Sequence, residues 1–310
     1  MAYYGIYDVT GSTTDRPEAL GTKEKFWLVP SASTGLTVTS YLFKIGRPLT
    51  GENWAEKVCC EILRHVGIPC AGYEFATHGG DAGVISQQFV PMNGRFLPAN
   101  MLLETAVKHY DGQLRFRQRK YQLSTSLNLI KLRSIGPPLA TPGKFSHLSA
   151  TDIFVGYLMF DILVSNTDRH HENWGVVIDY SERYSPTYTL APSFDHASSL
   201  GRNESDEARA RRLSSRDARD TVEAYVGRAR SAFYGSATAS QTLLQTEVLD
   251  SLIRLAPAST KQWATVFSAI PQKVYEDIFA RIDPKLISTQ ATEFALRMLH
   301  ANSATIRSAT

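Results

Sequence analysis

The sequence contains few cysteines, and they follow none of the spacings that bind metals. Cys59, Cys60 and Cys70 are an odd number with no Cys-x-x-Cys pair among them. This pattern disfavours both a disulfide framework and a zinc site. Because a free cysteine packs as a small apolar residue, we expect buried thiols in a reducing compartment.

Long apolar runs are also missing. No window approaches the ~18 uninterrupted apolar residues that a membrane span requires. The N-terminus has no basic region followed by an apolar one, so it does not resemble a secretory signal. We therefore expect a cytoplasmic protein that makes no membrane contact.

An excess of one charge sign is absent as well. Lys and Arg number 33 against 30 Asp and Glu, so we expect nucleic acid to be bound only indirectly or weakly. The hydrophobic share of 43% is that of an ordinary globular protein. A chain of 310 residues can form two lobes that share a cleft, where enzymes tend to hold small cofactors.

Residues 25–90 show strand and helix patterns in the order expected of a small nucleotide-binding lobe. Two β-like runs, FWLVP and VTSYLFKIG, flank a Ser/Thr/Gly turn, which predicts a hairpin. Residues 52–66 repeat apolar side chains at helical spacing, and Gly67 and Pro69 end that helix. Two more strands surround the turn at residues 78–81. The predicted order is β-β-α-β-β.

The middle of the chain carries a basic segment. Residues 113–133 contain six basic residues and no acidic one. Two interpretations stay open at this point. The segment can be a solvated helix or loop over the second lobe, or it can contact an acidic partner or nucleic-acid phosphate.

Residues 153–164 are apolar nearly all round, which predicts a helix inside the second lobe. Ser149 and Asp152 have the spacing of a capping box at its start. The helix leads into the polar loop SNTDRHHENWG, two β-like runs and the segment PSFDHASSLG. From Arg202 onward the patterns predict helices.

The polar loop gives the strongest indication of function. Asp168 and Asn173 follow the buried helix at the spacing Asp-x-x-x-x-Asn. Polar groups beside a core are costly unless they are engaged. A phosphotransferase needs a carboxylate that orients the acceptor hydroxyl, and amide or carboxylate oxygens that bind Mg²⁺. The hairpin after Asn173 would return the chain so that Asp195 completes this set.

Lys44 lies at the end of the second strand-like run, where its ammonium could hold the phosphates of a nucleotide. Glu56, on the following helix, is placed to pair with it. An unpaired lysine in a desolvated cleft would tend to lose its proton, so this pairing would preserve the charge.

Each of these residues also has a structural explanation when taken alone. Asp and Asn are common in turns and caps, and Lys44 could be a charge at a strand edge. His170 and His171 could bind zinc with Asp168, but adjacent histidines point in different directions and no third ligand is near. The order Lys, Glu, Asp-x4-Asn, strand pair, Asp favours phosphoryl transfer because five structural explanations would otherwise have to coincide.

At these residues the sequence resembles the HipA-like kinase family, bacterial serine/threonine kinases that include the toxins of toxin–antitoxin pairs. The matching segments span most of residues 20–201: LGTKEKFWLV, SYLFKIG, ENWAEKVCCEILRHVGIPCAGYE, VISQQFVP, FDILVSNTDRHHENWGV and APSFDHASSLG. The resemblance implies a bilobal, protein-kinase-like α+β fold. It places a β-rich N-lobe at residues 1–92 and a larger, mainly helical C-lobe at residues 93–310.

The resemblance also implies roles in catalysis and metal binding. Asp168 corresponds to the catalytic base, and His170 supports its loop. Asn173 and Asp195 correspond to the ligands of Mg²⁺.

Nucleotide binding is implied at a second set of residues, with ATP as the nucleotide. Lys44 corresponds to the phosphate-binding lysine and Glu56 to its ion-pair partner. Gln87 and Phe89 fall at the hinge that receives adenine.

Two features depart from the family pattern. Only about twenty residues precede the Gly-x-x-Glu-Lys strand start, so this is a compact form. The family can silence itself by phosphorylating a serine just upstream of that strand. Ser12, Thr13 and Thr14 lie in this region, although the local sequence does not reproduce the motif closely.

The leading hypothesis is a protein serine/threonine kinase with an unidentified protein substrate and, if it acts as a toxin, an antitoxin partner. The resemblance suggests a component of translation, such as an aminoacyl-tRNA synthetase, as the substrate. A kinase of small-molecule or lipid hydroxyls uses the same parts. A third hypothesis is a nucleotide-binding pseudo-enzyme or DNA-associated regulator that uses the basic segments at residues 115–133 and 209–230.

Overall fold

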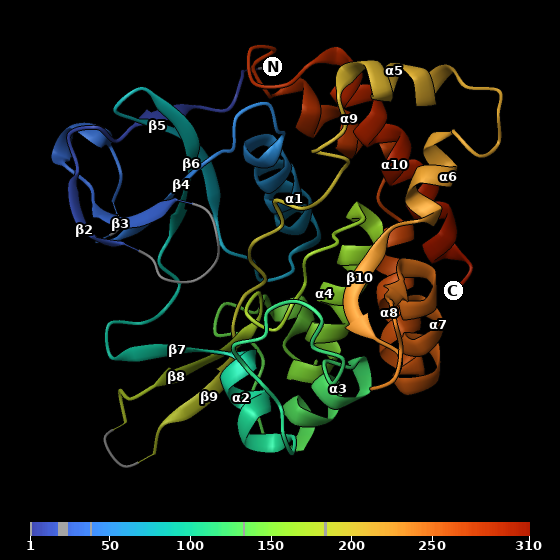
Figure 1. Cartoon of the computed structure of the whole chain (residues 1–310). Helices are drawn as coiled ribbons and strands as arrows, with labels where there is room; N and C mark the ends of the chain where they lie inside the picture. Colours follow the sequence, from blue (N-terminus) through green and yellow to red (C-terminus); the bar gives the residue numbers. More distant parts are fainter. Residues whose placement is uncertain (1, 18–23, 38, 133, 183–184) are drawn as a thin grey trace.

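The computed structural model describes residues 2–17, 24–37, 39–132, 134–182 and 185–310. It is a mixed α+β protein with a β-sheet in its N-terminal part and helices in its C-terminal part, as predicted. Figure 1 shows the sheet of β1–β6 at one side of the molecule and helices α7, α8 and α10 at the other. No helix in the described ranges combines the length and apolar character needed to cross a bilayer.

The N-terminal sheet has six strands in the order β1-β5-β6-β4-β3-β2. The two predicted hairpins are confirmed by the antiparallel pairs β3–β4 and β5–β6. Two strands near the N-terminus were not predicted, and the first of them, β1, pairs in parallel with β5. The strands are β1 (Ile6–Asp8), β2 (Thr13–Pro17), β3 (Lys25–Val29), β4 (Tyr41–Ile45), β5 (Tyr73–His78) and β6 (Asp81–Gln87).

Helix α1 (Glu52–Val66) has the predicted bounds. Its apolar stripe is buried against the sheet, since α1 packs on β5 and β6. The helix ends at Gly67, which has a φ of 82° and donates its N–H to Leu63 and Arg64 carbonyls. A residue with a Cβ would be strained at that φ, so glycine provides the C-terminal cap.

A second sheet contains β7 (Gly94–Pro98), β8 (Gly175–Asp179) and β9 (Thr187–Leu190) in sequence order. The pair β8–β9 confirms the predicted hairpin after Asn173. Strand β7 and the following helix α2 (Ala99–Ala106) were not predicted. The predicted domain boundary after residue 92 falls in the link between β6 and β7, and it stays a prediction.

Helix α4 (Ala150–Val164) forms the centre of the C-terminal part, and most of its side chains are buried on all sides. Ser149 and Asp152 form the predicted capping box, with Ser149 N donating to Asp152 Oδ2 at 2.9 Å. Gly156 faces the ring of Trp263 so closely that a Cβ would lie 2.6 Å from it. Glycine at this position therefore allows α4 to pack directly against α8.

The helices predicted after Arg202 are confirmed, but they are interrupted by a hairpin that the sequence analysis missed. Strands β10 (Arg230–Tyr234) and β11 (Thr242–Leu244) are too short to show a clear alternation of apolar and polar residues. The other elements are η1 (Ala32–Thr34), α3 (Leu123–Leu132), η2 (Gly143–Phe145), α5 (Asp206–Ser214), α6 (Val222–Gly227), α7 (Gln245–Leu255), α8 (Pro257–Ser268), α9 (Gln272–Ala280) and α10 (Thr289–Arg307).

Candidate active site

Lys44 lies in a buried cluster formed by three separate elements. Its side chain comes from β4, that of Glu56 from α1, and that of Asp195 from the segment after β9. Lys44 Nζ is 3.0 Å from Glu56 Oε1 and 3.4 Å from Asp195 Oδ1. Burial by itself would lower the pKa of Lys44, but the carboxylates of Asp195 and Glu56 outweigh it and raise that pKa. Lys44 is therefore a fixed cation.

The segment that carries Asp195 is held by side chains of the N-terminal part. Asp195 N donates to Tyr73 Oη at 3.1 Å, and His196 N donates to Glu56 Oε2 at 2.9 Å. Asp195 has a φ of 58°, in the left-handed region that residues with a side chain rarely occupy. Such strain persists only where the surrounding contacts determine the conformation. Tyr73 and Glu56 supply those contacts.

The loop between α4 and β8 brings Asp168 and Asn173 together. Asn173 Nδ2 donates to the carbonyl of Asp168 at 2.7 Å, and Asn173 N donates to that of His170 at 2.9 Å. Asp168 N donates to Asn166 Oδ1 at 3.1 Å. These bonds fold the loop back on itself, so the side chain of Asn173 lies against the backbone of Asp168.

His170 belongs to this loop, and its side chain is buried. Its Nδ1 accepts a hydrogen bond from Glu172 N at 3.1 Å, which assigns the proton to Nε2. Burial, with a smaller effect of Arg115, lowers the pKa of His170 to about 3, so the ring is neutral. Its Nε2 is 3.8 Å from Asp168 Oδ1, which is longer than a hydrogen bond. In this geometry His170 supports the loop backbone.

Arg169 is a residue that the sequence analysis missed. It is 2% exposed and pairs with Asp161 of α4. Its Nη1 donates to the carbonyls of Asn173 at 2.9 Å and Phe194 at 3.2 Å. Arg169 therefore ties the Asp168 loop to the segment of Asp195. Asp161 was the signal in the sequence from which a buried cation could have been predicted. It is an acid inside an apolar helix, and a buried acid needs a buried partner.

Arg115 is the second residue that was not identified individually. It belongs to the basic segment, and its Nη2 is 3.7 Å from Asp168 Oδ2, with Nε 3.8 Å from Glu172 Oε2. Its side chain is 18% exposed, so it is not part of a solvated face. Neither interpretation of residues 113–133 describes Arg115, because its acidic contacts, Asp168 and Glu172, belong to this chain.

A cavity of about 130 Å³ lies between the two sheets beside Lys44. Trp27 and Leu42, which are opposite each other on β3 and β4, line it from one side. Phe96 and Phe194, with ring centroids 5.5 Å apart, line it from the other. Its lining also contains the predicted site residues Lys44, Gln87, Phe89, Asn173 and Asp195.

A second cavity of about 350 Å³ continues from the first, since Lys25, Lys44 and Asp195 line both. Asp168 lines this second cavity. The remaining lining is mostly cationic or hydroxylic: Arg47, Arg115, Arg202, Thr167 and Ser198, with Phe116. The two cavities therefore join an aromatic compartment to one rich in positive charge.

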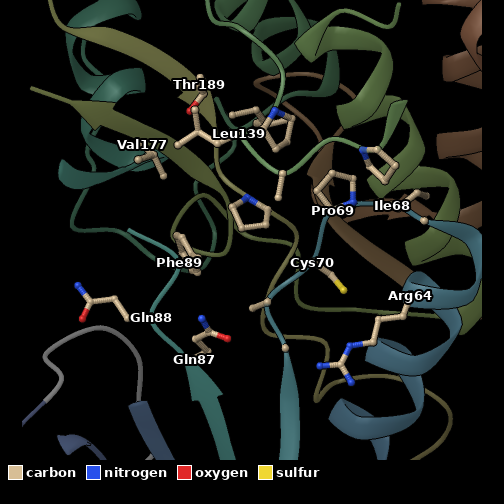
Figure 2. A pocket seen from close by; sticks show the side chains of 18 residues that line it. Arg64, Ile68, Pro69, Cys70, Gln87, Gln88, Phe89, Leu139, Val177 and Thr189 are labelled. Atoms are coloured by element: carbon tan, nitrogen blue, oxygen red, sulfur yellow. The ribbon is translucent and has the colours of Figure 1, made fainter. Parts of the chain in front are cut away.

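Gln87 and Phe89 also line a larger cavity of about 520 Å³ on their other side. Figure 2 shows Gln87 at the end of β6 and Phe89 on the chain that follows it, with Pro69, Cys70 and Leu139 across the cavity. Among its lining residues only Arg64 is charged. This cavity lacks the carboxylates and lysines of phosphoryl transfer, so the predicted chemistry belongs to the other two.

The oxygen atoms near Lys44 fit a magnesium ion better than zinc. Within the described residues, no group of three or more His, Cys, Asp or Glu side chains could hold a metal. Zinc sites normally need such a set. Magnesium is usually held by one or two protein oxygens, with water and substrate phosphates completing its shell. Asn173 and Asp195, which line the same cavity, offer that kind of donor set.

The predicted phosphorylation sites lie away from these residues. Ser12 directly precedes β2, and Thr13 and Thr14 belong to it, at one edge of the N-terminal sheet. None of the three lines either cavity beside Lys44. Gly21–Lys23 of the Gly-x-x-Glu-Lys start fall outside the described residues, and modification of this region stays a prediction.

Comparison with solved structures agrees with this architecture. The kinase CtkA of Helicobacter pylori, described as proinflammatory, superposes with a TM-score of 0.75 at 18% identity, over 98% of this chain and 96% of its own. HipA of Shewanella oneidensis, solved with HipB and operator DNA, superposes with a TM-score of 0.54 at 11% identity, over 96% and 66%. The predicted kinase-like fold is therefore confirmed.

The sequence comparisons give one clear assignment. Among curated protein sequences, none matches this chain. The family model described as HipA-like C-terminal domain matches residues 18–246, which is more than half of the chain and includes every predicted catalytic, nucleotide-binding and metal-binding residue. The chain therefore belongs to the HipA-like C-terminal domain family.

Proposed function

We propose that this chain is an ATP- and Mg²⁺-dependent protein serine/threonine kinase. The observation that carries the proposal is the contact of Lys44 with both Glu56 and Asp195, beside the loop of Asp168 and Asn173. Phosphoryl transfer requires this set of a phosphate-binding cation, metal-binding oxygens and a carboxylate at the acceptor. Membership of the HipA-like family and the kinase-like fold support it.

The nucleotide would bind across the two joined cavities. Its base would lie between Trp27 and Phe194, near the hinge residues Gln87 and Phe89. Its phosphates would extend past Lys44 into the cationic compartment. Because Lys44 is buried between carboxylates, it is held in place before the nucleotide binds, which reduces the entropic cost of ordering it.

Asn173 and Asp195 would hold Mg²⁺. The ion supplies neutralisation of the negative charge on the phosphate oxygens. Asn173 Nδ2 is engaged with the carbonyl of Asp168, so the amide oxygen is the atom available as a metal ligand. This bond also links the orientation of Asn173 to that of the Asp168 loop.

Asp168 would act on the acceptor. Its carboxylate would orient the hydroxyl and accept its proton while the acceptor oxygen bonds to the γ-phosphorus and ADP leaves. Arg115, 3.7 Å from Asp168, keeps positive charge beside this group. Because His170 is neutral, it adds no second positive charge beside the carboxylate of Asp168.

The acceptor in this proposal is a protein. The relative HipA was solved with HipB and DNA, and a similar antitoxin partner for this chain is part of the proposal. The arrangement would equally serve the hydroxyl of a small molecule or lipid, because fold does not determine substrate. The DNA-associated hypothesis is weakened at residues 209–230, where Arg211, Arg212 and Arg219 pair with acids of the same chain.

The test is transfer of radiolabel from γ-labelled ATP to whole-cell protein and, separately, to a metabolite extract. We expect protein labelling by the wild type and a loss of about a hundredfold or more in Asp168→Ala. Asp250→Ala, an exposed aspartate on α7, is the matched control and should retain activity. Label that appears only in metabolites would indicate a small-molecule acceptor instead of a protein. Activity of Asp168→Ala equal to that of the wild type would contradict the proposal.

A further inference from the structure

A fourth cavity, with a polar lining, adjoins the candidate active site. It measures about 350 Å³ and shares Thr167, Ser198 and Arg202 with the cavity that contains Asp168. Thr167 directly precedes Asp168 in the chain and is exposed. A ligand group in this fourth cavity would therefore lie next to the place where an acceptor hydroxyl must bind.

The lining of this cavity is strongly positive. Four arginines, Arg202, Arg212, Arg228 and Arg230, line it, and no Asp or Glu is among its lining residues. Hydroxyl groups and an amide form most of the remaining wall: Ser165, Thr167, Ser198, Ser199, Tyr225 and Asn203. Guanidinium forks and hydroxyls are the donors that bind phosphate and carboxylate oxygens.

Two of the arginines already have carboxylate partners. Arg202 bonds to Glu52, and Arg212 lies 3.1 Å from Glu204 and 2.8 Å from Asp220. These pairs fix the two side chains in the wall. Burial and the nearby Arg47 nevertheless lower the pKa of Arg202, as expected where positive charge is in excess.

The other two arginines bond only to backbone carbonyls among the described residues. Arg228 donates to the carbonyl of Arg219 at 3.0 Å, and Arg230 donates to that of Thr242. These contacts orient the guanidinium groups without neutralising them. Arg228 is exposed, so an anion can approach it from solvent.

We propose that this cavity binds the phosphate group of a protein acceptor that is already phosphorylated near its reactive hydroxyl. This inference rests on the proposed kinase function and narrows its substrate class. A cavity of about 350 Å³ beside Thr167 suits a single phosphorylated side chain. A nucleic acid would need a longer basic track along its backbone, and the other arginines of residues 209–230 are largely paired with acids.

The test measures binding by calorimetry, in the presence of saturating MgADP. The probe is a short peptide with a serine and a phosphoserine, compared with its unphosphorylated form and with inorganic phosphate. Of these three probes, we expect only the phosphopeptide to bind tightly. Arg228→Gln should weaken it about tenfold or more, and Arg228→Glu should abolish binding.

Arg219→Gln is the matched control, because Arg219 is 89% exposed, pairs with Asp217 and does not line the cavity. It should bind the probe as the wild type does. Binding that survives Arg228→Glu, or equal binding of the unphosphorylated peptide, would overturn the proposal. So would inorganic phosphate binding as tightly as the phosphopeptide, or single-stranded RNA displacing it with a dependence on Arg228.

The same experiment separates this inference from the proposed function. A protein that binds the phosphopeptide through Arg228 yet transfers no phosphate would contradict the kinase proposal alone. A protein that transfers phosphate but does not bind the phosphopeptide would contradict only the inference about the acceptor.

Discussion

Arg169 and Asp161 form two parallel hydrogen bonds, each 2.8 Å long, in the interior of the C-terminal part. Asp161 belongs to the central helix α4, and Arg169 belongs to the loop that carries Asp168. Because Arg169 also donates to the carbonyls of Asn173 and Phe194, one guanidinium joins the helix, the loop and the segment before Asp195. The relative position of the candidate catalytic and metal-binding residues therefore depends on this pair.

We expect Arg169→Lys to destabilise the protein by about 2–3 kcal/mol, because the charge is kept but buried hydrogen bonds to Asp161 and to two carbonyls are lost. A lysine ammonium cannot reproduce the two parallel bonds to Asp161. Urea unfolding measures the loss, with Arg211→Lys on the surface as the matched control. A change below about 1 kcal/mol in Arg169→Lys would contradict the structural role.

The cluster at Lys44 makes a different prediction. Lys44→Met leaves Glu56, which is 1% exposed, without its cation, and we expect a loss of stability of about 3–5 kcal/mol. Glu56→Gln in the same chain should recover part of the loss, because it removes the buried charge. The thermal stabilisation that ATP gives the wild type should disappear in both variants.

Lys131→Met is the control for this pair, because Lys131 is exposed on α3. It should keep both the wild-type stability and the response to ATP. If Lys44→Met keeps the response to ATP, Lys44 does not bind the phosphates. If Glu56→Gln adds its full effect to that of Lys44→Met, the two side chains are not energetically coupled.

Asp195→Asn tests the metal site. We expect ATP to bind the wild type at least about tenfold more tightly with Mg²⁺ than with EDTA, and this ratio to fall close to one in the variant. Asp195 also lies 3.4 Å from Lys44, so the substitution can change ATP binding through Lys44 as well as through Mg²⁺. The affinity for ATP in EDTA measures the effect through Lys44 by itself. Asp179→Asn, at the end of β8, is the control. A wild-type Mg²⁺ response in Asp195→Asn would exclude this residue as a ligand.

The sequence predicted the elements whose signals are local. Helix α1 has a buried stripe and a terminal Gly67, and the start of α4 has the Ser149 and Asp152 box. The order of Lys44, Glu56 and Asp195 along these elements indicated that they would converge. The helix and cap signals each lie within one turn or one helix, where side-chain spacing has a direct structural meaning.

What the sequence did not predict depends on partners that are distant in the chain. Strand β1 is three residues long and exists because it pairs in parallel with β5. Arg115 is one of six basic residues in its segment, and only the folded loop determines that it faces Asp168. Charge composition identified the segment, but it could not select the residue.

The capping box of α4 makes a prediction about pH. Burial by itself would raise the pKa of Asp152, but hydrogen bonds from Ser149 and Ser259 outweigh it and lower that pKa below its usual range. An acid with a lowered pKa stabilises the fold above its unfolded pKa of about 3.9, and this stabilisation is lost as the pH falls through the lower, folded value. Asp152→Asn should therefore be less stable than the wild type near neutrality, by about 1 kcal/mol, and the difference should shrink as the pH falls below about 4.

Taking the difference in unfolding free energy between the two proteins at each pH cancels the titration of every other group. A difference that grows on acidification would have the wrong sign for a hydrogen-bonded carboxylate and would contradict the capping role of Asp152.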